Sequence, residues 1–341
     1  MLFSHNLLRA LQNEVVGQDY ALTALTRAVT LALSGRRSQN RPLSVLLFAG
    51  PAAAGKTHVG TALARVLLGD ERRVITINCQ QLDRGLDPMS NLKQQLIAGW
   101  CLVATSSPPV PSPFNIVIFE EIAKAPAALR ESLATAIDRG GLLTDTYFFP
   151  IQDAFIIMTT TLSKKQTDQL LGRTIGFFKD GEAAEELPRM QALALEEMDT
   201  MLGTHLVSRT DEIIFFERLM PANVLDFLDK ELLRMRSALA VHSVGLVVDA
   251  DARSYLLSQG VEDLAHGMRQ IKRVLRNLLE FPLADLVLSG RLFPGTAVEV
   301  KYEPPGTFLH FQILIPYVGP SNFVPTEGRA FEAPIGPNSL E

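Results

Sequence analysis

Eight consecutive residues near the start of the chain have the types and the spacing that phosphate binding requires. They fit the pattern G-x-x-x-x-G-K-[ST] and follow an apolar run, Ser44 to Ala49, that predicts a strand. The small side chains let backbone N–H groups approach phosphates, Lys56 supplies charge for the β and γ groups, and Thr57 offers a hydroxyl to Mg²⁺. The pattern therefore predicts a phosphate loop that binds ATP with Mg²⁺. Its members are Gly50, Pro51, Ala52, Ala53, Ala54, Gly55, Lys56 and Thr57.

Two adjacent carboxylates supply the second part of this chemistry. Glu120 and Glu121 directly follow the apolar run Ile116 to Phe119, so a strand would carry them to the sheet edge where the phosphate loop opens. We expect Glu120 to hold the magnesium shell together with Thr57, and Glu121 to orient and polarise the attacking water. The alternative is a solvated acidic strand end. The phosphate loop upstream favours the catalytic interpretation.

Elements of an α/β fold must position these groups. A helix is expected from about Asp19 to Ser34 and another from Lys56 to Leu68, directly after the phosphate loop. Further strands are separated by helix-sized segments, so we predict a parallel sheet with helices on both faces. These strands are expected at Val74 to Ile77, Asn115 to Phe119, Ala154 to Met158 and Glu212 to Phe216.

After Leu219 the pattern changes to helices, which predicts a second domain. A strand hairpin turned by Pro304, Pro305 and Gly306 is expected to close it. The last residues are rich in Pro and Gly and lack an apolar period, so we expect them to be extended or disordered. The predicted division is 1–218, 219–318 and 319–341. The helices are expected at Pro221 to Leu239, Ala250 to Leu257 and Met268 to Leu288, and the strands at Ala297 to Tyr302 and Thr307 to Val318.

Composition narrows the class of protein. Over 341 residues, 47% are apolar and 20% are charged, which is typical of a folded globular chain. A net charge of -5 gives no general attraction to nucleic acid. The sequence shows no apolar stretch of the roughly 18 residues that a membrane span needs, and Met1 to Gln18 lacks a signal-like pattern, so a cytoplasmic location is expected. Cys79 and Cys101 are too few for a disulfide framework, and we expect them to be reduced and buried.

In order along the chain, several segments resemble the AAA+ superfamily, and specifically the second ATPase module of Clp-type disaggregases and unfoldases such as ClpB and ClpA. The resemblance covers about Val15 to Glu303 and implies an AAA+ P-loop NTPase fold with a smaller helical domain, ATP hydrolysis and a homohexameric ring. The segments are Val15-Val16-Gly17-Gln18, the phosphate loop, Glu120-Glu121-Ile122-Ala123-Lys124-Ala125, Arg209-Thr210-Asp211-Glu212 and His266-Gly267-Met268-Arg269.

The same resemblance implies roles for residues outside the two motifs. Val15 and Val16 would pack near the adenine, and Glu121 would be the catalytic carboxylate. Arg209 corresponds to the arginine finger that reaches the γ-phosphate of a neighbouring subunit, and Arg269 to the sensor arginine of the small domain. An arginine suits both tasks because its charge is permanent and its planar fork matches phosphate oxygens.

Departures from the family pattern affect hydrolysis. Glu120 stands where the family has the metal-associated Asp, and its extra methylene places magnesium geometry in doubt. The polar sensor, Asn in the family, falls at about Thr161, whose hydroxyl is shorter and offers one donor. Both departures predict slow turnover.

Two further segments concern partners. The interval Asn78 to Pro113 lacks the aromatic-glycine loop with which Clp motors grip polypeptide, and Trp100 fits better as a core residue of a helix from Asn91 to Val103. Thr174-Ile175-Gly176-Phe177 lies where some Clp unfoldases dock into a peptidase ring. We favour a loop packed on its own domain for this segment, because three residues recur often by chance.

Three hypotheses follow from these observations. The first is a ring-forming AAA+ ATPase that remodels or assembles a protein partner. The second is a nucleotide-gated structural or regulatory subunit with weak hydrolysis, and the third is a DNA-associated AAA+ loader. With no separate amino-terminal adaptor domain and no second ATPase module in the sequence, we expect loops, the tail or another subunit to select the substrate.

Overall fold

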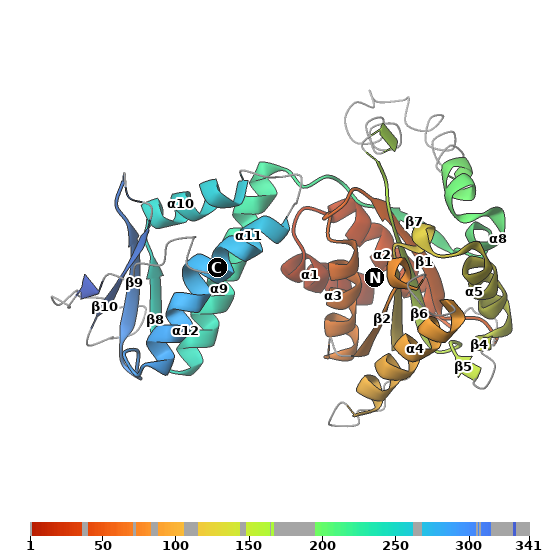
Figure 1. The fold of residues 1–341 in the computed structure, drawn as a ribbon, viewed down its shortest axis with the longest axis horizontal. Coiled ribbons are helices and arrows are strands. Elements are labelled where there is room, and N and C mark those ends of the chain that lie inside the picture. The colour runs from red at the N-terminus through yellow and green to blue at the C-terminus, as the bar shows by residue number, and fades with distance from the viewer. Residues whose placement is uncertain are drawn as a thin grey trace. The chain divides into compact units, whose positions relative to one another are not determined.

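A five-stranded parallel sheet forms the centre of residues 1–218. The computed structural model describes residues 2–35, 40–70, 73–82, 88–105, 115–143, 148–163, 165–166, 195–261, 268–304, 306, 308–314 and 330–331. The strand order is β2-β3-β6-β1-β7 (Figure 1). All neighbours run parallel, so the carboxyl ends of β1, β3 and β6 meet at one edge. The strands are β1 (Ser44–Gly50), β2 (Val74–Asn78), β3 (Asn115–Glu120), β6 (Ala154–Thr161) and β7 (Glu212–Phe215).

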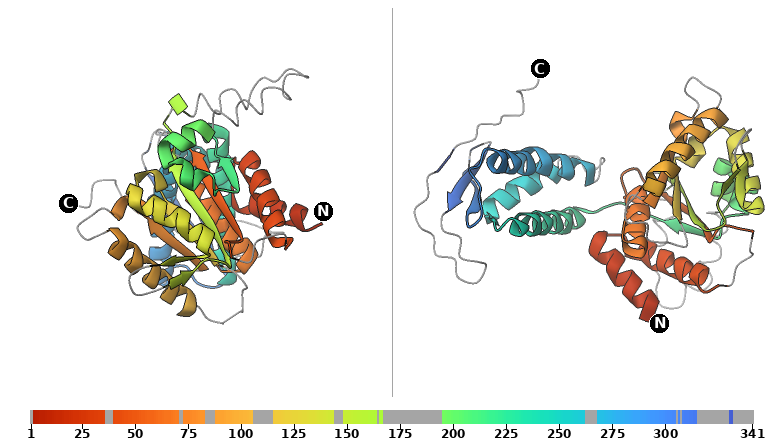
Figure 2. Two further views of the ribbon diagram at one scale, coloured as in Figure 1. Left: turned by 90° about the vertical axis from the view of Figure 1, so that its right-hand side faces the viewer. Right: turned by 90° about the horizontal axis from the view of Figure 1, so that it is seen from below.

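Helices cover both faces of this sheet, because side chains alternate along each strand. Leu46 and Phe48 of β1 belong to the core shared with α1, α2 and α3, whereas Val45 and Leu47 belong to the core shared with α4, α5 and α8. The left view of Figure 2 shows α1 and α2 in red on one side and α5 in yellow on the other. The helices are α1 (Leu2–Glu14), α2 (Asp19–Leu33), α3 (Lys56–Leu68), α4 (Pro88–Thr105), α5 (Ala127–Arg139) and α8 (Thr204–Val207).

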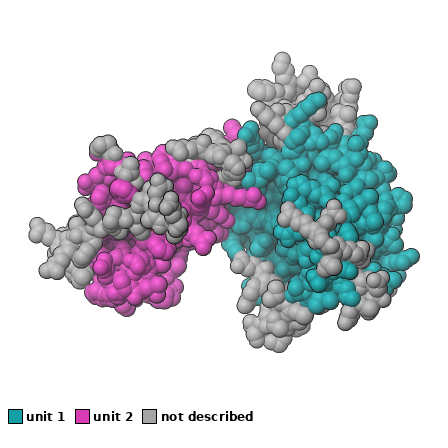
Figure 3. All heavy atoms as spheres, viewed as in Figure 1, with its two compact units in different colours: residues 1–218 teal, residues 219–341 magenta. Residues whose placement is uncertain are grey.

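A second compact unit follows Arg218 and spans residues 219–341 (Figure 3). Its described helices pack with a four-stranded sheet of order β11-β10-β9-β8. The helices are α9 (Pro221–Val241), α10 (Ala250–Val261), α11 (Met268–Leu275) and α12 (Phe281–Leu288), with a π-helical segment, Arg276–Glu280, between the last two. The strands are β8 (Gly245–Val248), β9 (Ala297–Tyr302), β10 (Leu309–Leu314) and β11 (Ala330–Phe331).

The structure confirms the predicted parallel sheet, the helical second unit and the antiparallel hairpin of β9 and β10. The expectation of helices alone before that hairpin was incomplete, since β8 pairs parallel with β9. The structure also contains elements that were not predicted. These are helix α1 and the short antiparallel pair of β4 (Gly141–Leu143) and β5 (Phe148–Pro150). Of the tail, only Ala330 and Phe331 are described, and they pair with β10. Among the described helices, none combines the length and the apolar character of a membrane span.

Candidate nucleotide site

The phosphate loop joins the carboxyl end of β1 to the first turn of α3. Gly50 is the last residue of the strand and Lys56 the first of the helix. Gly55, the N-cap of α3, has a left-handed backbone with φ 92°. Ala53, earlier in the loop, also has a positive φ, of 59°. The N-cap residue, Gly55, has no side chain to cap α3, so the loop leads directly into the first turn of the helix. A helix start of this kind, after a glycine loop, suits an anion.

Lys56 is the cation of this loop and lies almost entirely inside the protein. Its residue exposure is 7%, which is rare for lysine. The ammonium group donates to the carbonyl oxygens of Gly50 at 2.9 Å and Pro51 at 2.7 Å. These carbonyls stabilise the buried charge, and they hold it at the loop where a phosphate would bind.

Thr57 and Glu120 meet beside the loop, as the sequence predicted. The Thr57 hydroxyl donates to Oε1 of Glu120 at 2.7 Å, which joins the start of α3 to the end of β3. In the described part of the chain, no group of three or more His, Cys, Asp or Glu side chains is arranged to hold a metal. Magnesium does not require one, because it keeps several waters and takes one or two carboxylates beside phosphate oxygens. The pair of hydroxyl and carboxylate therefore fits Mg²⁺ that arrives with a nucleotide.

Glu121 is held in place by polar contacts on both carboxylate oxygens. Thr161 donates its hydroxyl to Oε1 at 2.5 Å, and the Lys124 ammonium lies 3.8 Å from Oε2. The backbone N–H of Glu121 donates to the Thr159 hydroxyl at 3.1 Å. With φ 55° and ψ 51°, Glu121 has the left-handed backbone that non-glycine residues seldom adopt. The structure thus places Thr161 directly against the predicted catalytic carboxylate, and opposite Gly50 in the pairing of β6 with β1.

The pKa of the Cys79 thiol is raised by its buried position and by the negative charges nearby. Burial raises the pKa of its thiol to about 12, and the charges of Glu120 and Glu121 add to the effect. The predicted burial of Cys79 is confirmed, whereas the Cys101 side chain lies outside the described residues.

This shift predicts how stability depends on alkaline pH. The thiol titrates at 9.0 in its ordinary state, so above that pH the folded protein holds the proton that the unfolded chain loses. The free energy of unfolding then falls as pH rises, by up to about 1.4 kcal/mol per pH unit from this group. Urea unfolding from about pH 8 to about pH 10 should therefore give a flatter curve for Cys79→Ala than for the parent chain. Parallel curves would contradict the assignment.

Gln18 lies behind the phosphate loop and contacts its backbone, which the sequence did not indicate. The predicted adenine neighbours Val15 and Val16 lie just before it, and Val15 is buried in the core of α1, α2 and α3. The Gln18 side chain is also buried, and its amide donates to the Ala54 carbonyl of the phosphate loop at 3.1 Å. In the sequence, Gln18 was notable only as the last residue of Val15-Val16-Gly17-Gln18, one of the segments that resemble the AAA+ superfamily.

Arg209 lies at the opposite edge of the sheet from the phosphate loop. Its carbonyl accepts a bond from Arg41 at 3.1 Å, and Asp211 accepts from the backbone of Val45, at the amino end of β1. Its guanidinium contacts Asp138 of α5 at 2.6 and 2.7 Å and donates to the His205 carbonyl at 2.7 Å. The length of β1, seven residues at roughly 3.3 Å each, separates this arginine from the loop of its own chain.

Arg269 belongs to the other unit, where it is the second residue of α11 and its side chain is exposed. Two other predicted segments, His266-Gly267 and Thr174 to Phe177, lie outside the described residues. Trp100 lies in α4 as expected, but its side chain is not described.

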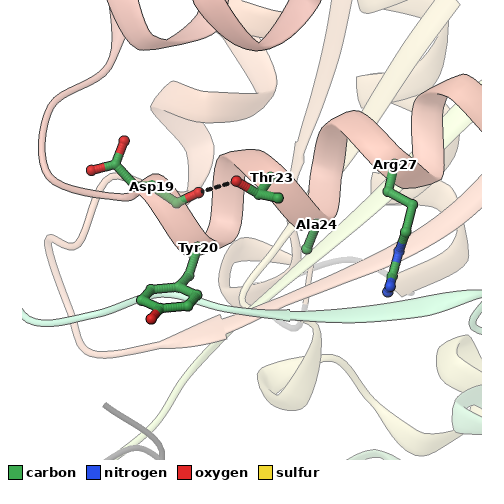
Figure 4. Close-up of a pocket in the computed structure, with 5 residues that line it drawn as sticks. All are labelled: Asp19, Tyr20, Thr23, Ala24 and Arg27. Atoms are coloured by element: carbon green, nitrogen blue, oxygen red, sulfur yellow. Dashed lines mark hydrogen bonds between the residues drawn. The ribbon is translucent and has the colours of Figure 1, made fainter. Parts of the chain in front are cut away.

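An open pocket of about 370 Å³ lies on α2 (Figure 4). Within it, the Thr23 hydroxyl donates to the Asp19 carbonyl at 2.8 Å, and Arg27 forms an ion pair with Glu212 of β7. No described lining residue belongs to the phosphate loop. The lining consists of Asp19, Tyr20, Thr23, Ala24 and Arg27.

Two domain families match the chain, one in each compact unit. Residues 41–213 match the AAA domain (Cdc48 subfamily), and residues 219–300 match the C-terminal D2-small domain of ClpB protein. The chloroplastic chaperone protein ClpD of Arabidopsis thaliana is 29% identical over 314 residues, which cover 87% of this chain and 32% of that protein. Chaperone protein ClpB of Pseudomonas putida is 28% identical over 301 residues, covering 86% and 33%.

The chain thus spans about a third of the length of these curated relatives. The AAA match alone accounts for half of the chain, and the small-domain match begins where the second compact unit begins. This chain belongs to the AAA+ family of ATPases, in its Clp branch.

Proposed function

We propose that the chain binds ATP with Mg²⁺ at the phosphate loop and hydrolyses it within a ring of identical subunits that remodels or assembles a protein partner. One observation carries the proposal. Lys56, Thr57, Glu120, Glu121 and Thr161 converge where β1, β3 and β6 end, joined by the Thr57–Glu120 and Glu121–Thr161 hydrogen bonds. A few polar groups at one sheet edge can bind and orient the reacting groups, because phosphoryl transfer depends mainly on positioning and charge stabilisation.

Each group has a task within that site. Lys56 exchanges its two carbonyl partners for β- and γ-phosphate oxygens. Thr57 and Glu120 hold Mg²⁺, which neutralises charge that develops on the phosphates. Glu121 orients and polarises the attacking water, and Thr161 fixes that carboxylate from the neighbouring strand.

The position of Arg209 supports a ring. Because β1 separates it from its own phosphate loop, we assign Arg209 to the γ-phosphate of an adjacent copy. Such a head-to-tail arrangement repeats until it closes, and six copies are the family expectation. We also assign Val15 and Val16 to the adenine and Arg269 to sensing of the phosphates. The curated relatives are chaperones by name, which supports a protein as the client.

A nucleotide-gated structural subunit is the second candidate. Glu120 carries one methylene more than the family's Asp, and Thr161 satisfies Glu121 with its single donor. Both features favour slow turnover, so that ATP binding rather than hydrolysis would build the assembly. A steady-state phosphate-release assay separates the two candidates.

Replacing Lys56 by Ala tests nucleotide binding itself. A hydrogen bond to a charged group is worth about 1.5–3 kcal/mol, so the affinity for ATP should fall roughly 10- to 100-fold. Titration calorimetry measures the change, with Lys301→Ala as the control because that lysine pairs with Glu299 in the second unit. Equal affinity in the Lys56 variant and the parent would remove the proposed site.

A further inference from the structure

Gln18 connects three separate parts of the first unit through one buried amide. Its residue exposure is 2%. Its Nε2 donates to the Ala54 carbonyl at 3.1 Å and to the Glu217 carbonyl at 3.0 Å, and its Oε1 accepts from the Glu217 backbone N–H at 3.0 Å. All three bonds reach backbone atoms, one in the phosphate loop and two in the segment after β7. A buried amide with this many partners is fixed in orientation.

The segment after β7 also contacts the phosphate loop directly, through Phe216 and not through Gln18. A Cβ added to Gly50 would lie 2.6 Å from the Phe216 carbonyl oxygen and 2.8 Å from the Phe216 Cβ. The Phe216 N–H also donates to the Ala49 carbonyl at 2.7 Å. Phe216 is therefore packed against the start of the loop, at Gly50, and Glu217 is linked to its later part, at Ala54, through Gln18.

The segment also lies at the boundary of the two units. Glu217 is the second-last residue of the first unit, and Leu219 opens the second. The Glu217 carboxylate has a buried Oε1 with no hydrogen-bond partner among the described residues, and burial followed by the charge of Asp19 raises its pKa. The two backbone bonds of Glu217 to Gln18 hold this segment against the buried amide.

We propose that Gln18 is a positioning residue that transmits occupancy of the phosphate loop to residues 217–219, the connection to the second unit. Phosphates that bind the loop's N–H groups reorient its peptides, including the Ala54 carbonyl that Gln18 contacts. Since the amide is rigid and shared, a change at Ala54 alters the two bonds to Glu217. The inference rests on the proposed nucleotide site and adds the route by which that site reaches the second unit.

Two substitutions separate this role from simple packing. Gln18→Leu removes all three bonds and replaces the amide by an apolar side chain of similar size. Gln18→Glu keeps an acceptor for the Glu217 N–H but loses both donated bonds. It is the test variant if Gln18→Leu does not fold. Gln12→Leu is the matched control, because it is the same substitution in the same unit and removes the bond that Gln12 of α1 makes to Asp19 at 2.9 Å.

Hydrogen exchange of the peptide spanning residues 213–220, in the full chain with and without Mg-ADP, tests the proposal. In the parent and in Gln12→Leu, ADP should slow exchange of this peptide on the order of 5-fold. In the Gln18 variants, ADP should still bind by calorimetry, while the nucleotide-dependent change disappears. A full change in Gln18→Leu overturns the inference.

Two other results are also decisive. A parent chain that binds ADP without any change in the peptide overturns the inference and leaves the proposed nucleotide site standing. A parent chain that binds no ADP removes the proposed function itself, and the inference with it.

Discussion

Replacing Glu121 by Gln is expected to lower ATP turnover by roughly 10²- to 10⁴-fold while ATP still binds, because a general base contributes about that much. Glutamine has nearly the same shape and keeps an oxygen that accepts from the Thr161 hydroxyl. It has no negative charge to polarise water, and it loses the attraction of the Lys124 ammonium 3.8 Å away. Chemistry should therefore change far more than ground-state binding.

Steady-state phosphate release and ATP affinity measure the two quantities separately. Glu131→Gln is a matched control, since this glutamate lies on α5, is largely exposed and pairs with His205. Turnover of the Glu121 variant equal to that of the parent contradicts the assignment. If the parent itself releases no phosphate above the background without enzyme, the structural-subunit candidate is favoured over the motor.

Much of the fold was predictable because its signals are local. The phosphate loop lies between an apolar strand and a helix, and the structure begins α3 at Lys56 as predicted. The apolar runs at β2, β3 and β6 predicted buried strands, and the parallel arrangement then required Glu120 and Thr57 to meet at one edge. Sequence order along parallel strands was thus enough to bring these site residues together.

Other features depend on contacts between distant parts of the chain. Gln18 and Glu217 are 199 positions apart, and Arg209 and Asp138 are 71 apart, so no local pattern indicates either pair. Strand β8 follows α9 and has only four residues, too few for a clear strand pattern in the sequence. It forms because it pairs with β9, which lies far along the chain. Strands β4 and β5 have three residues each, too few for a clear alternation.

Replacing Arg209 by Ala should lower turnover of the assembled protein by about 10³- to 10⁵-fold, the range that an arginine finger contributes. Each subunit should keep its ATP affinity, because Arg209 lies at the amino end of β1 and the phosphate loop lies at the other end. In the single chain, Asp138 and the His205 carbonyl hold the guanidinium with 25% of its side chain exposed. A neighbour's phosphate can therefore reach a group that is already oriented.

Mixing two inactive variants decides whether Arg209 acts between subunits. An Arg209→Ala subunit keeps its Glu121, and a Glu121→Gln subunit keeps its Arg209, so a mixed ring contains interfaces where both groups are present. Random mixing in equal amounts gives a complete site at roughly a quarter of the interfaces of a closed ring. Phosphate release should then rise well above the sum of the two variants measured alone. If Arg209 acted within its own chain, every mixed subunit would still lack one of the two groups, and mixing would restore nothing.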